Sequence, residues 1–93
     1  MPLTKADAFD ASKYWQLSDM VSLRDEEFGA LAYHHVNRRL VFLKSRELVD
    51  VIRRLGDFES ADDAITALVA PDQHDRYVAA LATLEKSALI SGR

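Results

Sequence analysis

The sequence contains no cysteine, only two proline and three glycine residues, and no long apolar run. The absence of cysteine excludes disulfides, thiol nucleophiles and zinc or iron–sulfur sites with thiolate ligands. No segment approaches the roughly 18 consecutive apolar residues of a membrane span, and residues 1–7 lack the apolar segment of a signal peptide. We therefore expect a cytoplasmic protein that contacts no membrane and carries no cofactor.

Clusters of basic residues are missing as well. The formal charge is −3 at pH 7, and basic and acidic residues are mixed along the whole chain. Proteins that bind nucleic acid usually neutralise phosphates with grouped Lys and Arg, so a nucleic-acid partner is not expected. The 93 residues, 48% of them hydrophobic, suffice for one globular domain. We expect a flexible lead-in over residues 1–13 and a single domain over 14–93.

Three short segments in the first half alternate like strands. Residues 20–24 form the first predicted strand, the acidic residues 25–27 a turn, and residues 28–35 the second strand. Within the second strand, Gly29 indicates a bulge or a close backbone approach. Asn37, which tolerates the left-handed conformation, closes a hairpin to a third strand at 40–43. Consecutive strands joined by short turns lie side by side, so the third strand is predicted to be an edge.

The apolar spacing becomes helical after Ser45, a predicted N-cap. A first helix at about 46–55 is expected to end at Gly56, and a second, capped by Ser60, ends before Pro71. A third helix is predicted from Asp72 to about Ile90, with a core stripe of Tyr77, Leu81, Leu84 and Ala88. This order predicts an α+β domain, in which a small three-stranded antiparallel sheet is followed by three helices.

No grouping of side chains indicates catalysis or a metal site. His34 and His35 are neighbours on a strand, so their imidazoles point to opposite faces and cannot readily hold one ion. His74 stands at no preferred ligand spacing from them. The acidic residues 25–27 have no apolar pocket that would shift a pKa toward acid–base catalysis. We therefore expect neither an enzyme nor a metal protein.

The third strand is the most informative segment, because it is apolar on both faces. Leu40 and Phe42 would face one side and Val41 and Leu43 the other, so one pair fills the core and the other needs a cover. Trp15 and Phe28 are expected to be core residues, since aromatic side chains supply the largest buried area in a small domain. The strand lacks the proline, bulge or inward charge that usually protects an edge.

The surroundings of this strand suit a guest peptide. The neighbouring Arg38 and Arg39 favour a partner with acidic residues. On the third helix, Ala80 and Thr83 belong to a face of small or polar residues, which would allow a chain to lie between helix and strand. The free backbone groups of residues 40–43 would bind such a chain as an added strand. The sequence therefore predicts a peptide-binding protein.

Several short stretches resemble a known family. They are Leu23-Arg24, Glu26, Phe28-Gly29-Ala30-Leu31, Tyr33-His34, Arg38-Arg39-Leu40 and Phe42-Leu43-Lys44-Ser45. Together they resemble the peptide chaperones of mycofactocin systems, small relatives of the PqqD-like RiPP recognition elements. The resemblance covers most of the chain and is densest at 21–45, whereas the helical part agrees in layout.

This resemblance implies a winged-helix-like domain and a non-catalytic chaperone. Such a chaperone binds the leader of a short precursor peptide by strand addition and presents it to a radical SAM maturase, which carries the iron–sulfur chemistry. At the matching positions of this sequence, the leader would lie along Arg39, Leu40, Val41, Phe42 and Leu43. It would also lie against the helix face that contains Arg76, Ala80 and Thr83.

Two alternatives remain at this point. A winged-helix DNA-binding regulator has the same element types, but the predicted third helix carries only Arg76 and Lys86 against three acidic residues. A homodimer in which the exposed strands of two copies pair would also cover the open edge.

Overall fold

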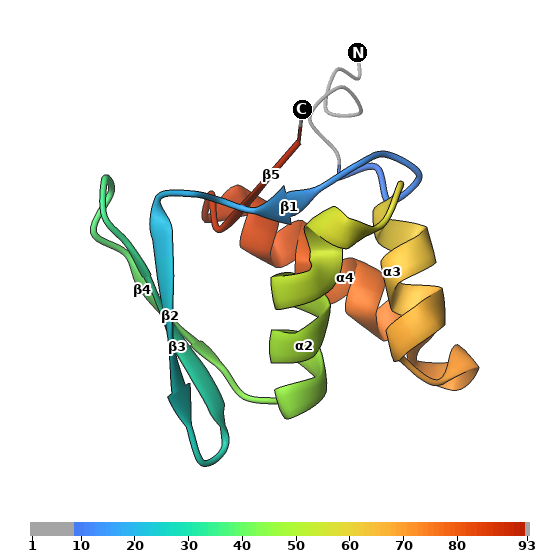
Figure 1. Ribbon diagram of the computed structural model, residues 1–93, viewed down its shortest axis with the longest axis horizontal. Coiled ribbons are helices and arrows are strands. Elements are labelled where there is room, and N and C mark those ends of the chain that lie inside the picture. The colour runs from blue at the N-terminus through green and yellow to red at the C-terminus, as the bar shows by residue number, and fades with distance from the viewer. Residues whose placement is uncertain (1–8, 93) are drawn as a thin grey trace.

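The computed structural model describes residues 9–92, in which a three-stranded sheet is followed by three helices (Figure 1). The strands β2 (Val21–Glu26), β3 (Gly29–His34) and β4 (Leu40–Leu43) form an antiparallel sheet in the order β2-β3-β4. The helices are α2 (Arg46–Arg54), α3 (Ala61–Leu68) and α4 (His74–Lys86), with 3₁₀ turns η1 (Leu55–Asp57) and η2 (Pro71–Gln73) between them. This arrangement confirms the predicted α+β class, and β4 is an edge strand as predicted.

A second, two-stranded sheet joins distant parts of the chain. β1 (Gln16–Leu17) pairs antiparallel with β5 (Ile90–Ser91), and the two lie across the top of the helices in Figure 1. The amide of Ser18 extends the pairing by donating to the carbonyl of Leu89 at 3.0 Å. The predicted helix through Ile90 is therefore wrong, because this residue belongs to a strand.

The early end of α4 has a backbone cause. Ala88 adopts a left-handed conformation with φ of 62°. The amide of Ala88 donates to the carbonyl of Glu85, and that of Leu89 donates to the carbonyl of Leu84, both at 3.0 Å. This pattern of a left-handed residue and two backward hydrogen bonds terminates helices, most often with glycine in the left-handed position. Ala88 is consequently exposed and does not belong to the core stripe, whereas Tyr77, Leu81 and Leu84 are buried as predicted.

Three of the predicted turns and stops differ in detail. β2 continues through Glu26, so Asp25 and Glu26 pair with β3 instead of forming a turn. In the next hairpin the left-handed residue is Arg38 (φ 65°) and not Asn37. Asn37 acts through its side chain, whose Oδ1 accepts the amide of Arg39 at 2.9 Å. Gly56 does not end α2 in a left-handed conformation, because the chain tightens there into η1.

Gly29 makes the close backbone approach that the sequence indicates. It begins β3 with φ of 153°, a conformation that L side chains rarely adopt. A Cβ atom at this position would collide with the carbonyl oxygen of Leu43 on the neighbouring strand. Only glycine lets β3 and β4 come together at this point.

The core lies between the sheet and the helices, with α2 directly beside the sheet (Figure 1). Its largest fully buried side chains include Leu43, Ile52, Leu55, Ile65, Leu81 and Leu89. Trp15 packs partly buried against this core, and its Nε1 donates to the carbonyl of Asp10 at 2.8 Å. The prediction that Phe28 is a core residue is wrong, since its side chain is 48% exposed.

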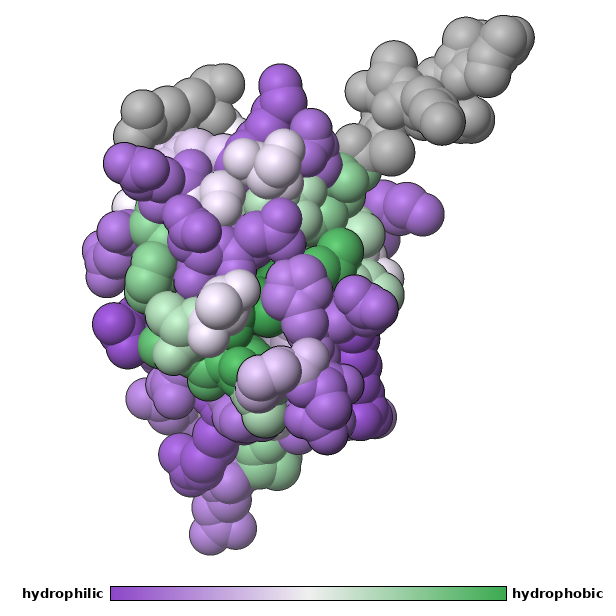
Figure 2. All heavy atoms as spheres, turned by 90° about the vertical axis from the view of Figure 1, so that its right-hand side faces the viewer, coloured by the Kyte–Doolittle hydropathy of each residue, from purple (hydrophilic) through white to green (hydrophobic). Residues whose placement is uncertain are grey.

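The helical end of the molecule has a mainly polar surface. Figure 2 shows the side that lies at the right of Figure 1, where polar residues surround a band of apolar atoms. None of the helices in the described part of the chain combines the length and apolar character that a membrane span requires.

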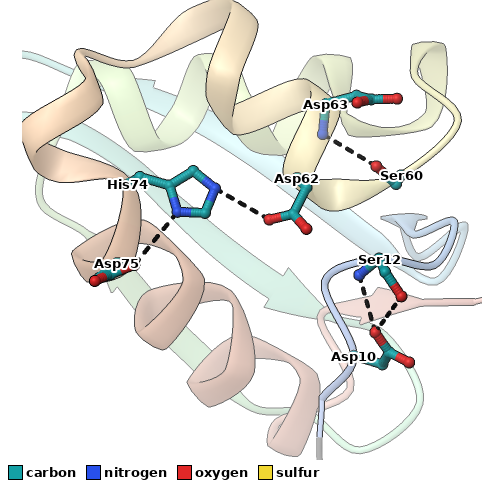
Figure 3. Close-up of polar contacts among 7 residues, drawn as sticks. All are labelled: Asp10, Ser12, Ser60, Asp62, Asp63, His74 and Asp75. Carbon is teal, nitrogen blue, oxygen red and sulfur yellow. Dashed lines mark hydrogen bonds and ion pairs between the residues drawn. The ribbon is translucent and has the colours of Figure 1, made fainter.

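Polar side chains fix the beginnings of α3 and α4 (Figure 3). The Ser60 hydroxyl accepts the amide of Asp63 at 3.0 Å and caps α3 as predicted. His74 lies between two carboxylates, with Nε2 3.0 Å from Asp62 and Nδ1 3.5 Å from Asp75, and so links α4 to α3.

A turn near the beginning of the described chain packs against the same region. The Ser12 hydroxyl and amide both donate to Oδ1 of Asp10, at 2.6 and 2.9 Å (Figure 3). These two bonds stabilise the carboxylate, chiefly the one from the hydroxyl, and lower the pKa of Asp10. The carbonyls of Ala11 and Lys13 accept amides from the first turn of α3. Residues 1–8, most of the predicted lead-in, lie outside the described residues.

Candidate peptide-binding site

The outer edge of β4 is open in the described part of the chain, because β4 pairs only with β3. The amide of His34 donates to the carbonyl of Arg39 at 2.9 Å, which makes these residues a hydrogen-bonded pair. In an antiparallel ladder such pairs recur at every second residue. Val41 and Leu43 therefore bond to β3, whereas the backbone groups of Leu40 and Phe42 point to the open side.

The side chains of β4 alternate as the sequence predicts. Leu43 is buried in the core and Val41 is half-buried. Leu40 and Phe42, on the opposite face, are 62% and 56% exposed. The residues whose backbone groups are free are thus also those whose side chains face solvent. Arg39, immediately before the strand, is exposed as well.

A pocket of about 300 Å³ lies between the beginning of α2 and the first turns of α4. It is lined by Ser45, Glu47, Leu48, Gln73, Arg76, Tyr77 and Ala80. Two of the three helix residues predicted for the site, Arg76 and Ala80, are therefore part of one pocket. The third, Thr83, is exposed outside it, and its hydroxyl donates to the carbonyl of Ala79 at 3.2 Å.

The hydroxyl of Tyr77 connects this pocket by hydrogen bonds to the segment that follows β4. Its hydroxyl lies 3.2 Å from Oγ of Ser45 and donates to Oε1 of Glu47 at 3.2 Å. Ser45 Oγ also accepts the amide of Leu48 at 3.2 Å. Ser45 is therefore both the N-cap of α2 and one of the residues that line the pocket. Sequence reasoning treats Tyr77 as core and Ser45 as a cap. Nothing in the spacing of residues so far apart in the chain indicates that they meet.

The histidine side chains have structural partners. His34 is buried, and its Nδ1 accepts the amides of Val36 and Asn37, both at 3.2 Å. His35 is exposed, and its Nε2 lies 2.6 Å from the Ser22 hydroxyl. No group of three or more His, Asp or Glu side chains in residues 9–92 is arranged to hold a metal ion.

Comparison with known proteins identifies the family. The model of the peptide chaperone MftB family matches residues 14–91, which contain the sheet and all three helices. The chain belongs to the peptide chaperone MftB family. The peptide chaperone MftB of Mycolicibacterium smegmatis is 42% identical over 83 residues, which are 88% of this chain and 81% of that protein. Those of Mycobacterium ulcerans and Mycobacterium tuberculosis are 40% and 36% identical over 86 residues, or 91% of this chain and 79% of each relative. No solved structure matches the chain.

Membership of the MftB family confirms the resemblance drawn from residues 23–45. It also confirms the prediction of a non-catalytic protein, since the family consists of peptide chaperones. The DNA-binding alternative gains no support from α4, where Arg76 and Lys86 are balanced by Asp75 and Glu85.

Proposed function

We propose that the protein binds the leader of a short precursor peptide as an added strand along β4 and presents it to a radical SAM maturase in mycofactocin biosynthesis. It would act in the cytoplasm and would leave the chemistry to the maturase. One observation carries this proposal: the backbone groups of Leu40 and Phe42 point to an edge that no described strand covers. The lack of proline, bulge or inward charge in β4 supports the same reading.

The backbone hydrogen bonds of an added strand contribute little net binding free energy by themselves. Leu40 and Phe42 offer two donors and two acceptors, and each hydrogen bond contributes about 0.5–1.5 kcal/mol. Ordering a flexible peptide costs on the order of 2–5 kcal/mol, so these bonds barely offset that cost. Useful affinity then requires side-chain anchors, each of which adds about 1.5–3 kcal/mol when it is fully buried.

The pocket between α2 and α4 is the natural place for such an anchor. Ser45, which lines it, stands two residues beyond the end of β4, so a peptide that follows the strand reaches the pocket at that end. Leu48 and Ala80 contribute apolar surface, and Arg76 contributes a cation. We expect an apolar leader side chain in the pocket, next to a carboxylate that pairs with Arg76.

Titration of the protein with its precursor peptide, followed by amide chemical shifts, tests this proposal. We expect the largest shifts at Leu40 and Phe42, with further shifts at Arg76 and Ala80. A peptide with the same composition but a scrambled leader serves as the control. Absence of binding, or shifts confined to α3, would contradict the proposal. A mass that rises with concentration in the absence of peptide would instead support the homodimer.

A further inference from the structure

The exposed large apolar side chains are confined to one part of the molecule. Among the described residues they are Met20, Phe28, Val36, Leu40 and Phe42. All five belong to the three-stranded sheet, its turns or the residue before β2, and none lies on a helix. Isolated exposed apolar residues are ordinary, but a group of them on one face marks an interaction surface.

Three of these side chains and one cation form a patch on the sheet face that points away from the helices. The rings of Phe28 and Phe42 meet edge to face, with centroids 5.5 Å apart. Phe28, Phe42 and Lys44 line a hollow of about 290 Å³, and Leu40 lies two residues before Phe42 on the same face. We call these four residues the outer patch. Its side chains face away from the core, which Leu43 occupies from the opposite side of β4.

The charges next to the β4 part of the outer patch are basic, whereas one acidic residue, Glu27, precedes Phe28. Within the described residues, Arg38, Arg39 and Lys44 form no ion pair, whereas Arg24 pairs with Glu26 and Arg53 with Asp25. If two copies of β4 paired antiparallel across a two-fold axis, the basic residues at its two ends would lie near each other and repel. The charges therefore disfavour a second copy of this chain and favour a surface with carboxylates.

We infer that the outer patch docks a folded protein whose contact surface combines apolar side chains with carboxylates, and that this protein is the radical SAM maturase. The inference rests on the proposed function, because it assigns a surface to the partner named there. The patch and the peptide edge share β4 but use different groups: side chains above the sheet for the enzyme, backbone groups at the edge for the leader.

This geometry couples the two binding events. A leader strand added to β4 would extend the sheet, so every second leader side chain would lie on the same face as the outer patch. The maturase would then contact a surface made by both chaperone and peptide. It should bind the loaded chaperone more tightly than the free one, and by reciprocity it should tighten leader binding by the same factor.

The test uses substitutions outside the residues assigned to the leader. Phe28→Ser removes one ring of the patch and Lys44→Glu reverses its charge. The matched controls are Val36→Ser, another exposed apolar side chain, and Lys13→Glu, a lysine near the beginning of α3. Binding to the maturase and to the precursor peptide is measured separately for the full-length chain. We expect roughly tenfold weaker maturase binding for Phe28→Ser, with peptide affinity unchanged and both controls equal to wild type.

Each of the other possible results of these binding measurements leads to a different conclusion. If both patch variants bind the maturase as wild type does, the inference is wrong and the proposed function stands. If the wild-type protein binds no precursor peptide, the proposed function itself fails. Loss of peptide affinity in Phe28→Ser would assign the patch to the leader. A concentration-dependent dimer that Phe28→Ser dissociates would assign the patch to self-association. Loss of peptide affinity and dissociation of a dimer would each overturn the inference.

Discussion

Replacing Phe42 by proline removes one donor from the open edge of β4, together with the ring that contacts Phe28. The amide of Phe42 points away from β3, because the hydrogen-bonded pairs of this ladder fall at Arg39, Val41 and Leu43. Proline is tolerated in edge strands where the missing N–H faces solvent. The fold should therefore persist while the peptide loses a partner.

The size of the effect follows from the bonds at this edge. The substitution deletes one hydrogen bond of about 0.5–1.5 kcal/mol, and the proline ring occupies the space that the carbonyl of an added strand would enter. We expect a second, neighbouring bond to be lost for that reason. Loss of two bonds amounts to about 1–3 kcal/mol, or roughly five- to 150-fold weaker binding.

Titration calorimetry with the precursor peptide measures this effect. Phe42→Ala is the matched control, because it also loses the ring but keeps the amide. Val41→Pro is the structural control: its amide points toward Ala32 of β3, so this variant should lower the midpoint of thermal unfolding. Equal peptide affinities of Phe42→Pro and Phe42→Ala would refute strand addition at this residue.

Three further substitutions test other parts of the structure. Gly29→Ala should destabilise the fold by about 2–5 kcal/mol in urea unfolding, since its Cβ would collide with the Leu43 carbonyl; an unchanged midpoint would contradict the close approach. Ala88→Gly should raise the free energy of unfolding by about 0.5–1 kcal/mol, because glycine adopts the left-handed conformation at this position without strain. A decrease would mean that the alanine methyl group contributes packing. Arg39→Glu should weaken peptide binding more at low salt than at 0.5 M, since an exposed charge is screened within about 10 Å at 0.1 M salt. A loss that does not depend on salt would assign Arg39 a packing role.

The strands and helices that follow one another in the chain could be predicted, because the patterns that indicate them involve residues close together in the sequence. Alternation of apolar residues and short turns are enough to place β4 at the edge of the sheet, and Ser45 and Ser60 cap the helices that they precede. Which face of β4 enters the core remained open in the sequence, since both faces are apolar. Packing against the helices decided it by burying Leu43.

Features that depend on distant residues were decided only in three dimensions. The pairing of β1 with β5 joins strands of two residues from opposite ends of the chain, which are too short to give a pattern. The pocket requires Ser45 and Tyr77 to meet, and helical spacing gives Tyr77 only as a buried residue. Phe28 is exposed because it stands in the turn between β2 and β3, where its ring packs against the exposed Phe42 and not against the core. The amino-acid sequence by itself determined the three strands of the larger sheet, the three helices apart from the end of α4, and the unprotected edge, because each depends on neighbours in the chain. The tertiary structure decided which apolar faces are covered, because burial depends on which elements pack together.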